Sequence, residues 1–164
     1  MASFESHIEQ TAKNLKFFQE INTKSDFFDW QVTALYYSAI HLMNAHIAKV
    51  GNLHYQSHSE LKKALNPDYP LSIGKIPESI FDHYISLEKL SRRARYLSNE
   101  RTNEQDGSIA FFTFEKHVSK AIQKLNTILL YFCSIYPTLK FENIQLHCPK
   151  VKEELKISLE YFSI

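Results

Sequence analysis

The sequence contains few of the residues that make tight turns. Three glycines and five prolines in 164 residues are too few for the many turns of an all-β sandwich or barrel, which argues against those classes. Cysteine is also scarce, because Cys133 and Cys148 are the two in the chain and no Cys-x-x-Cys motif is present. We therefore expect reduced thiols and a cytoplasmic protein.

Long apolar runs and an excess of one charge are missing as well. No apolar stretch reaches the length that spans a bilayer, and the opening MASFESHIEQ lacks the apolar region of a signal peptide. The 19 basic side chains nearly balance the 18 acidic ones, so no overall field draws the protein to nucleic acid or to a membrane. We expect no membrane partner, and any contact with nucleic acid must use a local patch.

The sequence is rich in aromatic residues and has one strongly apolar stretch. Twelve Phe and nine Tyr in a chain of this length predict one domain with a substantial core. Residues 29–51 contain no proline, and their apolar side chains fall on almost every face, which predicts a helix buried on most sides. Tyr37 and His41 are four residues apart and share one face of this predicted helix. Trp30 and Ala34 lie on the same face.

Apolar residues three and four apart predict further helices at residues 4–23, 57–65, 77–98, 111–136 and 149–162. The side chains that should point inward include Ile8, Ala12, Leu15, Phe18, Leu97 and Phe114. The polar segment 99–108 has no period, which predicts a loop. Residues 139–146 alternate weakly, which is typical of an extended segment.

Residues with capping chemistry should begin or end these helices. They are Ser6 with Glu9, Ser25 or Asp26, Gly51, Ser57 with Glu60, and Pro77. The elements together predict an all-α, four-helix up-down bundle over residues 1–136 with one short extra helix. Residues 137–164 should form a C-terminal helical extension packed on the same domain.

Several short motifs follow one another in an order typical of a known family. They are Tyr36-Tyr37 followed by His41, then Gly51, then Ser57-His58, then Arg92-Arg93-Ala94-Arg95-Tyr96. Over residues 28–136 this order resembles bacterial stand-alone HEPN domains (higher eukaryotes and prokaryotes nucleotide-binding). The resemblance implies a four-helix bundle that commonly dimerises. It also implies, as in many members, a metal-independent ribonuclease of a toxin–antitoxin or defence system.

The chain departs from the nuclease members of that family in one respect. Their signature is an arginine followed four to six residues later by a histidine, and no arginine here has a histidine at that distance. Relatives with the Tyr-Tyr…His helix often carry an arginine seven residues before the histidine, where this chain has Ala34. The missing arginines argue against nuclease activity. They do not change the expected fold.

Two histidines are the candidate catalytic residues. Imidazole titrates near neutral pH, so His41 can deprotonate a ribose 2′-OH or protonate the leaving oxygen. The alternative for His41 is a core histidine that is hydrogen-bonded to a tyrosine or to a backbone carbonyl. His58 follows the expected cap Ser57 at the start of a short helix, where a side chain can face a cleft. Its alternative is a surface or capping role.

Arginines near the end of the fourth predicted helix are the candidate phosphate ligands. Arg92 and Arg95 are three residues apart on one face, where guanidinium groups can bind a phosphate bidentately. The alternative is structural, because cations are favoured at a helix C-terminus and Glu88 lies four residues before Arg92 as a partner.

Tyrosines near these residues can stack on bases. Tyr36, Tyr37 and Tyr96 are the candidates, and their alternative role is core packing. We expect no metal site, because His41 and His46 are five residues apart and do not share a helical face, and no carboxylate completes a ligand pattern. We expect no cofactor, since the sequence has no glycine-rich phosphate loop.

Two hypotheses follow from these residues. The first is a HEPN-like homodimer that binds RNA or a nucleotide, with His41 and His58 catalytic if it cleaves and Arg95, Arg92 and Tyr37 holding the ligand. The second is a non-catalytic interaction module or antitoxin-like dimeric scaffold that uses the apolar bundle face and residues 139–164. The resemblance further implies a cognate antitoxin or a nucleotidyltransferase-like protein as the partner.

Overall fold

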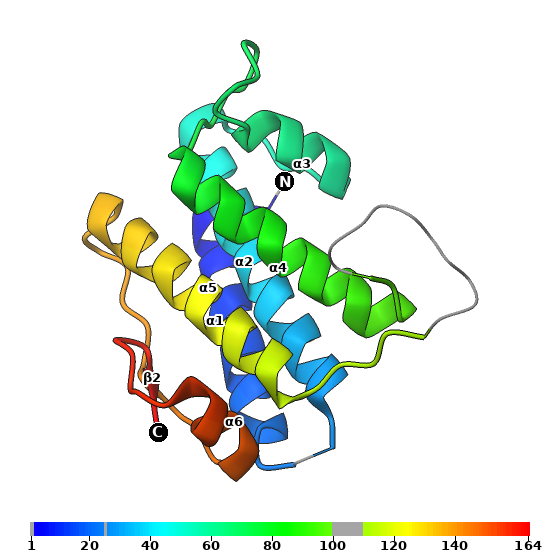
Figure 1. Cartoon of the computed structure of the whole chain (residues 1–164). Helices are drawn as coiled ribbons and strands as arrows, with labels where there is room; N and C mark the ends of the chain where they lie inside the picture. The colour runs from blue at the N-terminus through cyan, green and yellow to red at the C-terminus, as the bar shows by residue number, and fades with distance from the viewer. Residues whose placement is uncertain (1, 25, 100–109) are drawn as a thin grey trace.

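The computed structural model describes residues 2–24, 26–99 and 110–164, and these ranges are mostly helical (Figure 1). The helices are α1 (Phe4–Ile21), α2 (Phe28–Gly51), α3 (His58–Leu65), α4 (Glu78–Tyr96), α5 (Glu115–Ile135) and α6 (Pro149–Leu155). Two short strands, β1 (Ile144–Gln145) and β2 (Phe162–Ser163), complete the elements. The predicted all-α class is confirmed. In the described ranges, no helix combines the length and the apolar character that a bilayer crossing requires.

The four long helices α1, α2, α4 and α5 alternate in direction around one core, as the colour gradient in Figure 1 shows. Helix α2 packs against α1, α4 and α5, and α4 also packs against α5. The fully buried side chains of α2 include Val32, Leu35, Tyr36, Leu42, Met43 and Ile47. The stretch predicted to be buried on most sides is therefore the central helix of the fold. Its exposed face carries Trp30, which is 56% exposed, and Tyr37.

The predicted inward face of α1 is confirmed at Leu15 and Phe18 and wrong at Ala12. Ser3 is its N-cap, and the Ser3 hydroxyl accepts a bond from the backbone N–H of Ser6 at 3.2 Å, so the expected Ser6–Glu9 capping box is wrong. The buried face consists of His7, Thr11, Leu15 and Phe18, whereas Ala12 is exposed and Ile8 only half-buried. The polar pair His7 and Thr11 can face inward because both find hydrogen-bond partners there.

Helix α2 begins and ends one residue away from the expected caps. Phe27 flanks its start, rather than Asp26, and Ser25 lies outside the described residues. At the other end Asn52, not Gly51, adopts the left-handed conformation with φ 49°. Asparagine tolerates this conformation because its short polar side chain can bond locally.

The cap of α3 is confirmed, and that of α4 is shifted. The Ser57 hydroxyl accepts from the backbone N–H of Glu60. Pro77 precedes α4 in an extended conformation, and the helix begins at Glu78. At Leu97 the backbone enters the left-handed region with φ 52°, which ends the helical period, so this side chain is exposed and not inward as predicted.

Helix α5 begins four residues later than the prediction of 111. The ring of His117 accepts from the backbone N–H of Phe114 at 2.9 Å, which fixes the start of the helix at Glu115 and leaves Phe114 outside it. Phe114 is consequently exposed, contrary to the expectation that it points inward. Of the polar segment predicted as a loop, residues 100–108 lie outside the described ranges.

The C-terminal segment is less helical than predicted. Helix α6 ends at Leu155, because Lys156 adopts φ 68°. The chain then returns so that β2 pairs in parallel with β1, with Ile144 opposite Phe162. Phe162 is fully buried and meets Phe18 of α1 edge-on, with ring centroids 6.1 Å apart. Because α6 packs on α5 and β1 on α1, this segment shares the core of the bundle.

Replacing Gly74 with alanine should destabilise the protein by about 1 to 2 kcal/mol, because overpacking a filled core costs free energy. A Cβ atom at Gly74 would lie 2.5 Å from Cδ1 of Ile47 and 3.3 Å from the His46 ring. Urea denaturation followed by circular dichroism measures the change.

Gly51→Ala is the matched control for Gly74→Ala. Its Cβ would meet the exposed end of Ile73 at 3.0 Å, and that side chain can move. Alanine is also the better helix former. We expect a change within about 0.5 kcal/mol at Gly51. Equal effects at the two glycines would contradict the close packing of Gly74 against Ile47 and His46 of α2.

Candidate functional site

Arg95, in the last turn of α4, lies among tyrosine rings. Its guanidinium carbon is 5.7 Å from the ring centroid of Tyr36, 5.9 Å from that of Tyr37 and 5.1 Å from that of Tyr96. Its Nε donates to the carbonyl of Ser91 at 3.4 Å. Within the described residues no carboxylate forms an ion pair with Arg95. The positive charge is thus held by aromatic faces, with guanidinium donors still available to a ligand.

His58 is the first residue of α3 and lies beside the same tyrosines. Its Nδ1 is 3.5 Å from the Tyr36 hydroxyl, and its ring centroid is 5.8 Å from that of Tyr36 and 6.4 Å from that of Tyr37. Burial and then the charge of Arg95 lower the pKa of His58, while Glu88 opposes them. The imidazole is therefore neutral at pH 7 and able to accept a proton. We call Tyr36, Tyr37, His58, Arg95 and Tyr96 the arginine–tyrosine cluster.

The floor of this cluster is a pair of buried tyrosines. Tyr36 and Tyr84 are fully buried, and their rings stack at 6.1 Å. Burial is the main cause that raises the pKa of both hydroxyls. Both hydroxyls therefore remain protonated, and Tyr36 can donate to His58. Core packing is the role of Tyr36, whereas Tyr37 and Tyr96 are 36% and 67% exposed and can meet a ligand.

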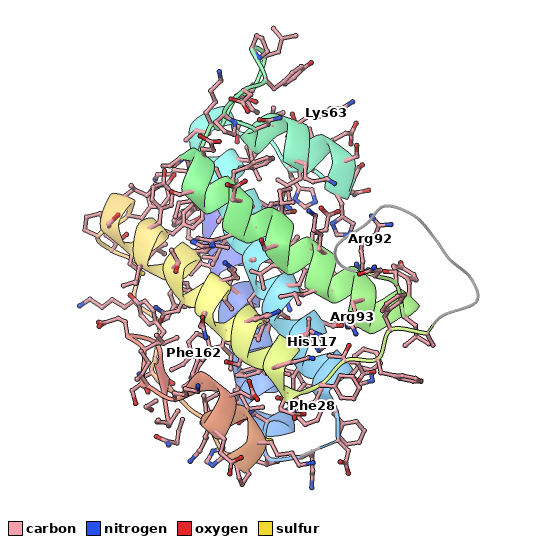
Figure 2. The ribbon with its side chains drawn as sticks, in the orientation of Figure 1. Phe28, Lys63, Arg92, Arg93, His117 and Phe162 are labelled. Atoms are coloured by element: carbon pink, nitrogen blue, oxygen red, sulfur yellow. The ribbon has the colours of Figure 1, made fainter. Side chains whose placement is uncertain are left out.

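Arg92 is exposed and lacks the expected partner. The carboxylate of Glu88 pairs instead with Lys62 of α3, at 3.0 and 3.1 Å, so the predicted Glu88–Arg92 pair is wrong. The Lys62–Glu88 ion pair connects α3 to α4. Figure 2 shows Arg92 on the side of α4 that is turned toward α3, and Arg93 near the start of α5. Arg92 therefore adds an unpaired positive charge, within the described residues, next to the cluster.

His41 belongs to a different group of side chains. Its Nδ1 lies 3.1 Å from Nδ1 of His7 on α1, and Nε2 of His7 lies 3.0 Å from Nδ1 of His54, in the segment before α3. We call these three residues the histidine chain. His41 and His54 are half-buried, whereas His7 is 2% exposed. As the alternative to a catalytic role, His41 was expected to bond to a tyrosine or to a backbone carbonyl. That expected partner is wrong, because His41 bonds to His7.

The histidine chain and the arginine–tyrosine cluster are neighbours on one face of α2. Tyr37 and His41 are four residues apart, which is about 6 Å along a helix. In the described part of the molecule no hydrogen bond or ring contact joins His41 to His58 or Arg95. The structure thus brings His58, Arg95 and Tyr37 together and places His41 one helical turn away.

The geometry of the histidine chain differs from that of a metal site. His7 faces His41 with one ring nitrogen and His54 with the other, so the three rings do not converge on one point. Among the described residues no group of three histidine, cysteine or acidic side chains has an arrangement that holds a metal ion. His46, the other histidine considered, bonds through Nδ1 to the Tyr136 hydroxyl at 2.7 Å.

A groove of about 760 Å³ lies away from these residues, between the outer face of α1 and the segment 140–147. Lys16, Gln19, Phe141 and His147 are among the residues that line it. None of the predicted site residues is part of its lining.

Two members of the histidine chain, His7 and His54, are not among the site residues predicted from the sequence. His7 is spaced with Thr11, Leu15 and Phe18 as one continuous helical stripe, which could have indicated that it faces inward. His54 lies in a segment without helical periodicity, where the sequence carries no signal for its direction.

The fold and these two groups define an all-α protein with a partly exposed arginine–tyrosine cluster beside a chain of imidazoles. Comparisons with protein families, with curated proteins and with solved structures found no match. The geometry of the residues is therefore the basis for assigning a function.

Proposed function

We propose that this chain is a HEPN-like protein that binds RNA or a nucleotide at the arginine–tyrosine cluster. The observation that carries the proposal is Arg95, whose charge lies among tyrosine rings and has no carboxylate partner in the described residues. A guanidinium group binds phosphate bidentately. The exposed rings of Tyr37 and Tyr96 offer faces on which bases can stack.

The neutral histidines support a metal-independent ribonuclease as the catalytic form of this proposal. One neutral imidazole would take the proton of a ribose 2′-OH as its oxygen attacks the neighbouring phosphorus, and the leaving 5′-oxygen would take up a proton from the imidazolium that forms or from solvent. Burial is the main cause that lowers the pKa of both His58 and His41, so both are proton acceptors at pH 7. Arg95 would stabilise the charge on the phosphate. Such an activity is typical of toxin–antitoxin or defence systems.

Exposed aromatic residues favour the alternative of a non-catalytic interaction module or antitoxin-like dimeric scaffold. Trp30 and Phe112 are 56% and 58% exposed, next to the ends of α2 and α5. Large aromatic side chains are enriched where proteins bind one another. In this alternative the arginine–tyrosine cluster binds no RNA, and protein partners such as a second copy or a cognate antitoxin cover the aromatic residues.

Arg95→Ala should weaken the binding of a fluorescent single-stranded RNA pool by about tenfold, a change of about 1.4 kcal/mol. The loss is expected because the variant removes both the charge and the bidentate donors. Arg95→Lys keeps the charge but loses the bidentate donors. Its affinity should therefore lie between those of the unmodified protein and of Arg95→Ala. Fluorescence anisotropy at one fixed salt concentration measures the affinity, since phosphate contacts depend strongly on salt.

Lys89→Ala is the matched control for this experiment. Lys89 is an exposed cation on the same helix, so its loss changes the net charge equally and should change the affinity less than about twofold. No RNA binding by the unmodified protein would overturn the proposal and favour the interaction module. Equal losses at Arg95 and Lys89 would overturn the assignment of the site.

A further inference from the structure

The histidine chain has a hydrogen-bonding constraint that fixes where its protons lie. Each contact, between His41 and His7 and between His7 and His54, joins two ring nitrogens at 3.0 to 3.1 Å, and each needs one N–H and one lone pair. Neutral His7 has a single N–H. It must therefore donate to one neighbour and accept from the other.

Two arrangements of the protons satisfy this constraint. In the first, Nδ1–H of His41 donates to His7, and Nε2–H of His7 donates to His54, so that Nε2 of His41 carries a lone pair and Nε2 of His54 carries a proton. In the second, every bond is reversed, and Nε2 of His54 carries the lone pair. His41 and His54 thus always hold opposite tautomers, because the hydrogen bond of one nitrogen sets the state of the other.

We propose that His41, His7 and His54 form a proton relay, in which a proton taken up at Nε2 of one end residue leads to release of a proton from Nε2 of the other. The transfer conserves protons at each step. His41 gains a proton at Nε2 and passes its Nδ1 proton to His7. His7 passes its Nε2 proton to His54, and His54 releases its own Nε2 proton. The three rings are neutral before and after, and the chain has changed from the first arrangement to the second.

The burial of the three rings suits such a relay. His7, the middle residue, is almost inaccessible to water, whereas both ends are half-buried, so a proton that passes from His41 to His54 along the chain goes through His7. Burial first, then the charges of His41 and His54, lower the pKa of His7 to about 4. Burial and then His54 lower that of His41. Within the described residues no carboxylate, lysine or arginine contributes to either shift, so a proton is not trapped on the middle ring.

The relay itself requires no ligand. Its use in catalysis rests on the proposed function, in which His41 would take a proton from a ribose hydroxyl and the relay would pass one to the segment before α3. The experiment is therefore made on the protein alone, so that a failure of RNA binding and a failure of the relay are separate results.

Nitrogen-15 NMR of the histidine side chains tests the relay directly, because the shifts of Nδ1 and Nε2 report which nitrogen carries the proton. At pH 7.5 we expect opposite tautomers for His41 and His54. If the two arrangements exchange rapidly, the Nδ1–H fractions of His41 and His54 should add up to one. The same predominant tautomer at both residues in the unmodified protein would overturn the relay, whatever its variants do.

The variant His7→Phe should uncouple the two end residues, because it keeps a ring of similar size and removes both bonds. His41 and His54 should then each adopt a tautomer independently, and their Nδ1–H fractions should no longer add up to one. His83→Phe is the control, since His83 is a half-buried histidine of α4 outside the chain, and it should leave both tautomers unchanged. His7→Leu serves as a second variant with the same expectation, because its side chain can neither donate nor accept, and unchanged tautomers in folded His7→Phe and His7→Leu would overturn the proposal.

Discussion

Replacing Asn22 with alanine should lower the free energy of unfolding by about 3 kcal/mol. Asn22 is fully buried at the C-terminal end of α1. Its Nδ2 donates to Oε1 of Gln31 at 2.9 Å, and its Oδ1 accepts from the backbone N–H groups of His147 and Cys148 at 2.7 and 3.2 Å. One side-chain amide thus joins α1, α2 and the segment that leads into α6.

The large effect follows from the groups that the variant leaves without partners. Alanine cannot accept from the backbone N–H of Cys148, which is buried, or donate to Gln31, which is also buried. A buried polar group without a partner costs about 1 to 3 kcal/mol, more than the net gain from an ordinary hydrogen bond. Urea denaturation measures the change, and an unchanged slope of unfolding against urea would show that the unfolded state is unaffected.

Asn143→Ala is the matched control for Asn22→Ala. Asn143 also bonds through both side-chain atoms, to the Glu160 carbonyl and the Ser163 hydroxyl, but it is exposed. Water can replace these partners, so we expect a loss below about 1 kcal/mol. A similar cost at both asparagines would contradict the view that burial makes Asn22 important.

Lowering the pH from 7 to 4 should destabilise the protein by about 2 kcal/mol through His7 alone. Its pKa is lowered from 6.5 to about 4 in the folded state by burial and by the neighbouring His41 and His54. Between these values the unfolded chain binds a proton that the folded protein excludes, so stability falls as the pH falls. The contribution is complete above pH 6.5 and is lost near pH 4. The full shift corresponds to a larger energy, which we reduce because water reaches the outer rings of the chain.

The variant His7→Gln should flatten this pH dependence without abolishing it. Burial also lowers the pKa of His41, His46 and His58, and these residues keep a slope of the same sign. The exposed His147 provides the control, because His147→Gln leaves the buried histidines in place. Denaturation curves recorded from pH 4 to pH 8 give the profile, and an identical slope in His7→Gln would contradict the role of His7.

Helical periodicity predicted the long helices and left their ends uncertain. The central helix was predictable because its apolar residues cover almost every face, and the Ser57 cap because hydroxyl and backbone lie within one turn. The ends depend on contacts with distant residues. The run from Pro149 to Phe162 reads as one helix, yet Phe162 is drawn into the core beside Phe18 and forms β2 instead. Local pattern does not encode that contact.

The candidate site was also predictable only in part, because local pattern predicts which face of a helix a residue occupies but not its neighbours on other helices. Tyr36 and Tyr37 are adjacent and differ by about 100° around the helix, so one becomes the buried floor and the other an exposed face. The order of the motifs predicted a site that contains His58 and Arg95, and both side chains lie beside Tyr36 and Tyr37. His41 instead joins His7, because the pairing of α1 with α2 decides its neighbours and a single helix does not carry that information.

The most direct test of the central claim is an NMR titration of the protein with a short single-stranded oligoribonucleotide. If the arginine–tyrosine cluster binds RNA, the signals of the Arg95 Nε–H, the His58 ring and the Tyr37 and Tyr96 rings will shift along one saturable curve, while the groove between α1 and residues 140–147 will not respond. Shifts that are largest in that groove, or no saturable shift in the cluster, would contradict the account.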